Sequence, residues 1–165
     1  MALSDKIDKR ELLPYHILVA SIFAGLNEMG MLNQASVNVA SRRAGKYLAE
    51  YTQTQGLLDA EALTAPHAEK VKRLIEKLDA LIELGTRVTV SGTVDGAEIR
   101  IFSMGCKFCP KGVGEAELKG ALCPYPGLIE EYVNAFLDDN DKVKLVSTHR
   151  RHLRKLDDNC VMVLR

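Results

Sequence analysis

The sequence has no excess of charge of either sign, no long apolar run, and no cysteine before residue 100. Lysine plus arginine equals aspartate plus glutamate, at 22 each, so no field of the whole molecule favours nucleic acid or an anionic membrane. No apolar stretch approaches the roughly 20 residues that span a bilayer, and no signal-type apolar block follows the N-terminus. We therefore expect a cytoplasmic protein with neither a membrane nor a nucleic-acid partner.

Several functional patterns are also missing. The sequence contains no internal repeat, no recognisable helix-turn-helix, and no Ser-His-Asp set or carboxylate pair that can be argued from spacing. No histidine follows a pattern that we could match to a haem ligand. These absences favour a non-enzymatic role over catalysis, and they do not support direct reading of DNA.

The length of 165 residues and the hydrophobic content of 47% suit one sizeable core. In the first half, apolar residues recur at three- and four-residue steps, which predicts helices over 14–29 and 36–51 and a third from about Pro66 to Gly85. We expect a single domain over residues 1–165, with a helical part over about 1–85 and a sheet and cysteine loop over about 86–165.

The period changes to two at residue 86, where alternating apolar residues flank Asp95-Gly96 and predict a hairpin. A helix is predicted after Cys123-Pro-Tyr-Pro-Gly, up to about residue 138, and a second strand pair over 142–149 and 160–164, with a turn near 157–159. The expected class is α+β. N-terminal helices would pack on an antiparallel four-stranded sheet with a cysteine loop and a crossover helix.

The cysteines carry most of the functional information. Cys106 and Cys109 form a C-x-x-C, Cys123 precedes a proline, and Cys160 lies in the last predicted strand. In a reducing compartment this pattern indicates a metal site or redox chemistry rather than a structural disulfide. The gaps between the cysteines match no standard zinc ribbon or ferredoxin motif, so only the fold can bring the four thiols together. The metal would be zinc or an iron-sulfur cluster, and Cys160 is alternatively a buried core residue.

Two neighbouring segments have weaker signals. The basic run His149-Arg150-Arg151-His152 could bind an anion or a nucleic-acid phosphate, or supply a histidine ligand. We favour a solvated, twisted strand end over these alternatives. Lys111-Gly112-Val113-Gly114 lacks the features of a phosphate-binding loop, and we interpret it as flexibility beside the cysteines.

The element order, with cysteines between the second strand and the last helix and another in the terminal strand, resembles the 4-vinyl reductase domain family over residues 14–165. These predicted hydrocarbon-binding domains are similar in fold to vesicle-tethering transport-particle subunits. The resemblance implies a small-molecule-binding or redox-responsive regulatory module with a metal held by Cys106, Cys109, Cys123 and Cys160. A thiol-dependent enzyme and a structural or assembly subunit of the vesicle-tethering type are the alternatives.

The same resemblance implies a small apolar molecule as ligand, in a pocket between the helices and the sheet. Tyr47, Tyr51, Phe102 and Tyr132 are the candidate ligand-binding residues. Apolar stripes of this kind also fill ordinary cores. An unused helical face would suit a homodimer, and the helix over 14–29 is the candidate surface.

Overall fold

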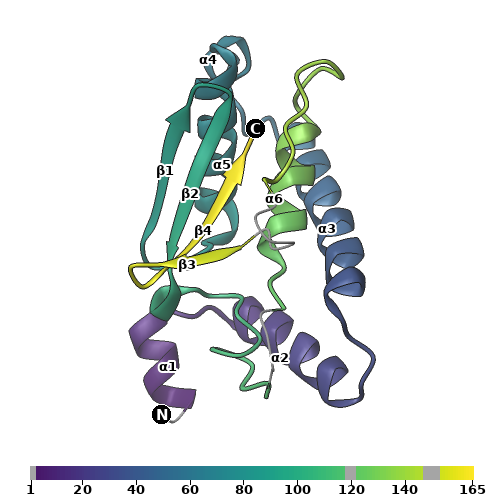
Figure 1. Ribbon diagram of the computed structural model, residues 1–165, viewed down its shortest axis with the longest axis vertical. Coiled ribbons are helices and arrows are strands. Elements are labelled where there is room, and N and C mark those ends of the chain that lie inside the picture. Colours follow the sequence, from purple (N-terminus) through teal and green to yellow (C-terminus); the bar gives the residue numbers. More distant parts are fainter. Residues whose placement is uncertain (1–2, 118–121, 147–152) are drawn as a thin grey trace.

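The computed structural model describes residues 3–117, 122–146 and 153–165. Figure 1 shows the elements of these segments in space. In chain order they are α1 (Leu3–Arg10), α2 (Pro14–Glu28), α3 (Gln34–Thr54), α4 (Ala60–Thr64), α5 (His67–Ile82), β1 (Val88–Thr93), β2 (Gly96–Phe102), the 3-10 turn η1 (Ser103–Gly105), α6 (Tyr125–Asn134), β3 (Arg154–Leu156) and β4 (Asn159–Leu164).

The predicted α+β class is confirmed. Within the described residues the four strands form one antiparallel sheet in the order β1-β2-β4-β3. α5 packs against β1 and β2, α6 packs against α5, and α3 packs against α6 on the side away from the sheet (Figure 1). α1 and α2 lie at the end of the sheet where β2 runs into η1 (Figure 1).

The core lies between α5, α6 and the sheet because each contributes an apolar face at its own period. α5 buries Val71, Leu74, Ile75 and Leu78, which recur at helical spacing. β2 buries Ile99 and Ile101, which alternate with more exposed neighbours. The terminal strand buries Val161, Met162 and Leu164 and half-buries Val163, as expected for a strand with neighbours on both sides.

α3 and α6 approach each other unusually closely. A Cβ atom built on Gly45 of α3 would lie 2.3 Å from the Leu128 carbonyl oxygen of α6. Such a distance is far inside van der Waals contact, so only glycine fits at this crossing. The close packing fixes the position of α6, and with it the position of Cys123, which lies just before the helix.

The second strand pair differs from the prediction. The hairpin partner of β4 is β3 at 154–156. Residues 144–146 of the predicted strand do pair with the far end of the terminal strand, through the Leu145–Leu164 bridge and backbone hydrogen bonds to Val163 and Arg165. Both segments lie beside β4, and alternation alone could not tell which forms the hairpin. Residues 147–149 of the predicted strand lie outside the described residues.

Two helices were not predicted. α1 and α4 are short, at eight and five residues, and short segments offer too few turns for a periodic signal. In the described parts of the chain, no helix has the length and apolar character needed to cross a membrane.

Candidate functional site

The loop that carries the first two cysteines is held at the end of the sheet by the segment that follows α5. Cys106 forms an antiparallel bridge with Gly85, and the Lys107 amide donates to the Leu84 carbonyl at 3.1 Å. α1 also reaches the loop, because buried Arg10 donates from Nη1 to the Cys106 carbonyl oxygen at 2.6 Å. The first cysteine is therefore fixed from two sides.

Cys109 lies at the start of a tight turn. Its sulfur accepts the Gly112 N–H at 3.3 Å, and its carbonyl oxygen accepts the Val113 N–H at 2.7 Å. A Cβ atom on Gly112 would lie 2.8 Å from Arg10 Nη1, and one on Gly114 would lie 2.4 Å from a backbone oxygen of α2. The glycines that we assigned to flexibility in fact allow close packing around the cysteine turn.

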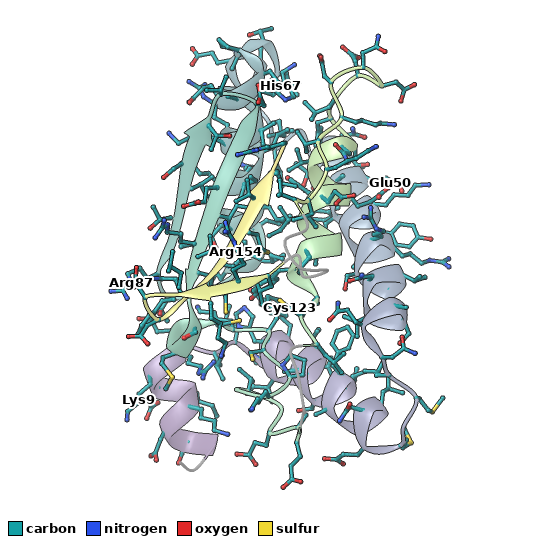
Figure 2. All side chains as sticks on the ribbon, in the orientation of Figure 1. Lys9, Glu50, His67, Arg87, Cys123 and Arg154 are labelled. Carbon is teal, nitrogen blue, oxygen red and sulfur yellow. The ribbon has the colours of Figure 1, made fainter. Side chains whose placement is uncertain are left out.

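Cys123 and Cys160 come from two other elements. Cys123 precedes Pro124 at the start of α6, and Figure 2 places it between the sheet and α2. Cys160 lies in β4, opposite Ile101 of β2 and Lys155 of β3. Cys160 is therefore carried by a strand, whereas Cys123 lies two residues before the first residue of α6.

The four thiols influence one another's protonation, so the fold gathers them in one region. Cys106 and Cys109 are hydrogen bonded through their side chains. Cys109 also interacts electrostatically with Cys123 and with Cys160, and those two interact with each other. Cys123 also interacts with Cys106, so Cys109 and Cys123 each interact with the three other cysteines. We call Cys106, Cys109, Cys123 and Cys160 the thiol cluster.

The two loop cysteines share one proton. The hydrogen bond from Cys106 lowers the pKa of the Cys109 thiol to about 6, despite burial, and the backbone N–H groups of Gly112 and Lys111 and the charge of Arg10 act in the same direction. That hydrogen bond, followed by burial, raises the pKa of the Cys106 thiol well above its ordinary value. The pair therefore carries one negative charge near neutral pH, centred on Cys109.

The outer cysteines hold their protons more tightly. Burial raises the pKa of the Cys123 thiol to about 12, and the charges of Cys109 and Cys160 add to this effect. Burial also raises the pKa of the Cys160 thiol, with Lys155 opposing. A second thiolate in the cluster is thus unfavourable unless a cation enters with it.

Tyr125 connects the thiol cluster to the core. Its buried hydroxyl accepts the Phe108 N–H at 3.3 Å, lies 3.7 Å from the Cys106 sulfur, and donates to the Leu84 carbonyl at 2.5 Å. Burial, and then the nearby Cys106, raises the pKa of Tyr125 well above its usual value, so the hydroxyl stays neutral.

Sequence reasoning missed Tyr125 and Arg10 as site residues. The position of Tyr125, two residues after Cys123, was a usable signal. Arg10 offered none, because the helix that carries it was not predicted.

The four thiols lie in one region, but they are not arranged as the ligands of a metal site. Across the described residues, no three His, Cys, Asp or Glu side chains already stand in an arrangement that could hold a metal ion. Ligation by Cys106, Cys109, Cys123 and Cys160 therefore stays a prediction.

Comparison with known proteins identifies a family whose description names no activity. The family whose model matches residues 30–165 is described as the MJ0207 family. The chain belongs to this family. The matched region contains the whole thiol cluster, whereas Arg10 lies before it.

A relative from Methanocaldococcus jannaschii, "Uncharacterized protein MJ1342", is 35% identical over 52 residues. The match spans 32% of this chain and 46% of that protein, so the chain covers less than half of the relative's length. No solved structure matches. None of these findings bears on the 4-vinyl reductase resemblance, which stays a prediction.

The predicted ligand-binding residues are not gathered like the thiols. Tyr47 and Tyr51 are 53% and 51% exposed on α3, whereas Tyr132 is fully buried on α6 with its hydroxyl 3.2 Å from that of Thr52. Phe102, at the end of β2, lies under the guanidinium of Arg87 at 4.2 Å. Two of the four therefore face outward and cannot line an interior pocket with Tyr132.

The basic run His149-Arg150-Arg151-His152 lies outside the described residues. The predicted helical surface over 14–29 does carry exposed apolar side chains, since Leu18 is 60% exposed and Ile22 is 52% exposed on α2.

Proposed function

We propose that this protein is a redox-responsive regulatory module in which the thiol cluster holds a metal centre, zinc or iron-sulfur. The observation that carries the proposal is that the cysteine loop, the segment before α6 and strand β4 bring their cysteines close enough to interact with one another. A reducing cytoplasmic compartment is part of the proposal, because it keeps the thiols available.

The donor set suits a thiophilic metal. Four sulfur ligands are the common set for structural zinc and for iron-sulfur clusters. One thiolate is already favoured at Cys109, and the protonated Cys106, Cys123 and Cys160 would have to lose protons on binding. A bound cation supplies the charge that makes several adjacent thiolates stable.

Metal binding would also have to draw the thiols closer together. Cys123 starts the turn into α6, and Cys160 lies in β4 between β2 and β3. Closing the cluster would therefore tie the cysteine loop to both elements, and losing the metal would release them. This coupling is the physical basis of the proposed response.

Oxidation provides the other half of the response. A hydroperoxide can accept two electrons and two protons from the Cys106 and Cys109 thiols, which form a disulfide while the peroxide is reduced to water and an alcohol. The disulfide removes two thiolate ligands, so the metal would leave. The hydrogen bond between these two side chains supports their pairing.

Metal analysis of anaerobically purified protein tests the proposal. We expect about one zinc ion or one cluster per chain, with iron-sulfur recognisable by broad visible absorption. Cys123→Ser should lose the metal. Val163→Ser, a substitution at a half-buried position in β4, controls for damage to the sheet and should retain it. Protein that takes up neither zinc nor an iron-sulfur cluster during reconstitution would contradict the proposal.

A thiol-dependent enzyme is the second candidate, and the surroundings of Cys109 favour it. The sulfur accepts a backbone N–H from Gly112 and lies beside the Arg10 charge, which are the features of an activated thiol. Metal-free protein should then be alkylated at Cys109 faster than free cysteine at neutral pH, with Cys160 as the internal comparison. Equally slow alkylation of all four cysteines would count against this candidate.

The apolar ligand and the assembly role remain proposals that rest on the family resemblance alone. For an assembly subunit of the vesicle-tethering type, Cys123→Ser should reduce stability and leave partner binding intact. A small apolar ligand should bind whether or not the metal is present.

A further inference from the structure

α3 has one face toward the molecule and one face without any neighbour among the described elements. Its buried residues, Val37, Ser41, Gly45, Ala49 and Thr52, face α6. The other side forms the edge of the molecule, where Glu50 points outward (Figure 2). We call this exposed side, at positions 40, 43, 44, 47, 50 and 51, the outer face of α3.

The outer face carries large aromatic side chains beside small ones. Tyr47 and Tyr51 are about half exposed. Ala44 and Ala40, which lie about one and two helical turns before Tyr47, are also exposed. The spacing of 40, 44, 47 and 51 follows the alternating four- and three-residue steps of a helix-helix seam. Exposed tyrosines of this kind are enriched in protein interfaces.

The face also carries opposite charges that are too far apart to pair with each other. Arg43 and Glu50 are seven residues apart, which is about 10 Å along a helix. Neither forms an ion pair with another residue in the described part of the chain. Arg43 instead lies over the ring of Tyr47 at 5.6 Å and donates to its hydroxyl at 3.2 Å.

These features complement a reversed copy of the same face. With a two-fold axis between positions 45 and 46, Ala44 lies opposite Tyr47 of the second copy. Ala40 lies opposite Tyr51 in the same way, so each large side chain meets a small one. Arg43 then flanks Glu50 of the second copy, and the symmetry creates this ion pair twice.

We propose that the outer face of α3 is the interface of a homodimer, formed by antiparallel packing of α3 against α3 of a second copy of this chain. The match of size and the match of charge follow from one placement of the axis, which is why a second copy fits better than an unrelated partner. The exposed apolar residues of α2 are not needed for this contact. The proposed interface therefore replaces α2, which we predicted from the sequence as the candidate dimer surface.

Sedimentation equilibrium of the full chain, under reducing conditions, tests the proposal. The wild-type protein should approach twice the chain mass of 18.2 kDa. Arg43→Glu and Glu50→Arg should each weaken dimerisation at least tenfold, because each places like charges together across the axis. The double variant should regain most of the wild-type affinity. Lys144→Glu, the matched change of charge at an exposed position away from α3, should have no effect.

Two further variants separate the competing surfaces. Ala44→Glu introduces a charge into the seam at an exposed position and should abolish the dimer while the circular dichroism spectrum stays unchanged. Leu18→Ser on α2 should leave the dimer intact. A protein that is monomeric at every concentration, a double charge variant as weak as the single variants, or loss of the dimer only in Leu18→Ser would each overturn the proposal.

Discussion

Replacing Tyr125 by phenylalanine removes the hydroxyl that links the thiol cluster to the core. The ring stays, so the loss is confined to hydrogen bonds. The Leu84 carbonyl keeps the Lys107 amide as a donor, and the Cys106 thiol keeps Cys109 as an acceptor. The buried Phe108 N–H, however, donates to the Tyr125 hydroxyl and to no other group among the described residues.

The expected cost combines one lost hydrogen bond, about 1 kcal/mol, with one unsatisfied buried N–H at about 1–3 kcal/mol. We therefore expect Tyr125→Phe to lower the free energy of unfolding by about 2–4 kcal/mol. Tyr132→Phe is the matched control, because that tyrosine is equally buried but, within the described residues, its hydroxyl is hydrogen bonded to Thr52 alone. Thr52 also donates to the Leu48 carbonyl. The control should cost about 1 kcal/mol.

Urea unfolding of both variants, followed by circular dichroism at neutral pH with a thiol reductant, measures the difference. The slope of the transition should be unchanged, since the same surface is exposed on unfolding. Equal stability losses in Tyr125→Phe and Tyr132→Phe would refute the reasoning, because they would show that the three contacts of Tyr125 contribute no more than the single contact of Tyr132.

Two other predictions concern the helices. Gly45→Ala should destabilise the protein by about 1–3 kcal/mol through overpacking against α6, although alanine favours helices. Gly25→Ala in α2, where a Cβ meets nothing within 4 Å, should be neutral or stabilising by up to about 1 kcal/mol, and equal behaviour of the two variants in urea unfolding would argue against the close crossing. Burial lowers the pKa of His16, whose Nδ1 accepts the Leu13 N–H, so the unfolded chain binds a proton that the folded chain excludes. Stability should therefore fall as the pH drops below about 6.5, by up to about 1.4 kcal/mol per pH unit, and His16→Gln should flatten this dependence.

Much of the fold could be predicted from periodicity. The starts of α2 and α5, the β1-β2 hairpin at Asp95-Gly96 and the helix after Cys123 lie close to their predicted positions. Each of these signals is local, because a few turns of helix or a short alternation determine which face is buried. The pairing of β4 was less accessible, since residues 143–146 and 154–156 both approach it and neither has a stronger strand pattern.

The candidate site divides in the same way. The cysteines could be identified from their spacing, but Arg10 could not, because it approaches the loop from α1 at the far end of the chain. The proposed pocket residues Tyr47 and Tyr51 illustrate the opposite error. A helical stripe of apolar residues shows that one face differs from the other, and here the packing of α3 against α6 leaves both tyrosines outside.

The sequence by itself determined the α+β class, the main helices, the first hairpin and the four cysteines as the residues of interest, because these depend on neighbours within a few positions along the chain. Only the tertiary structure decided that the four thiols lie close enough to interact, that Arg10 and Tyr125 contact the cysteine loop, and that the outer face of α3 is exposed. Those properties depend on contacts between segments far apart in sequence, which the packing of the core selects and no local pattern encodes.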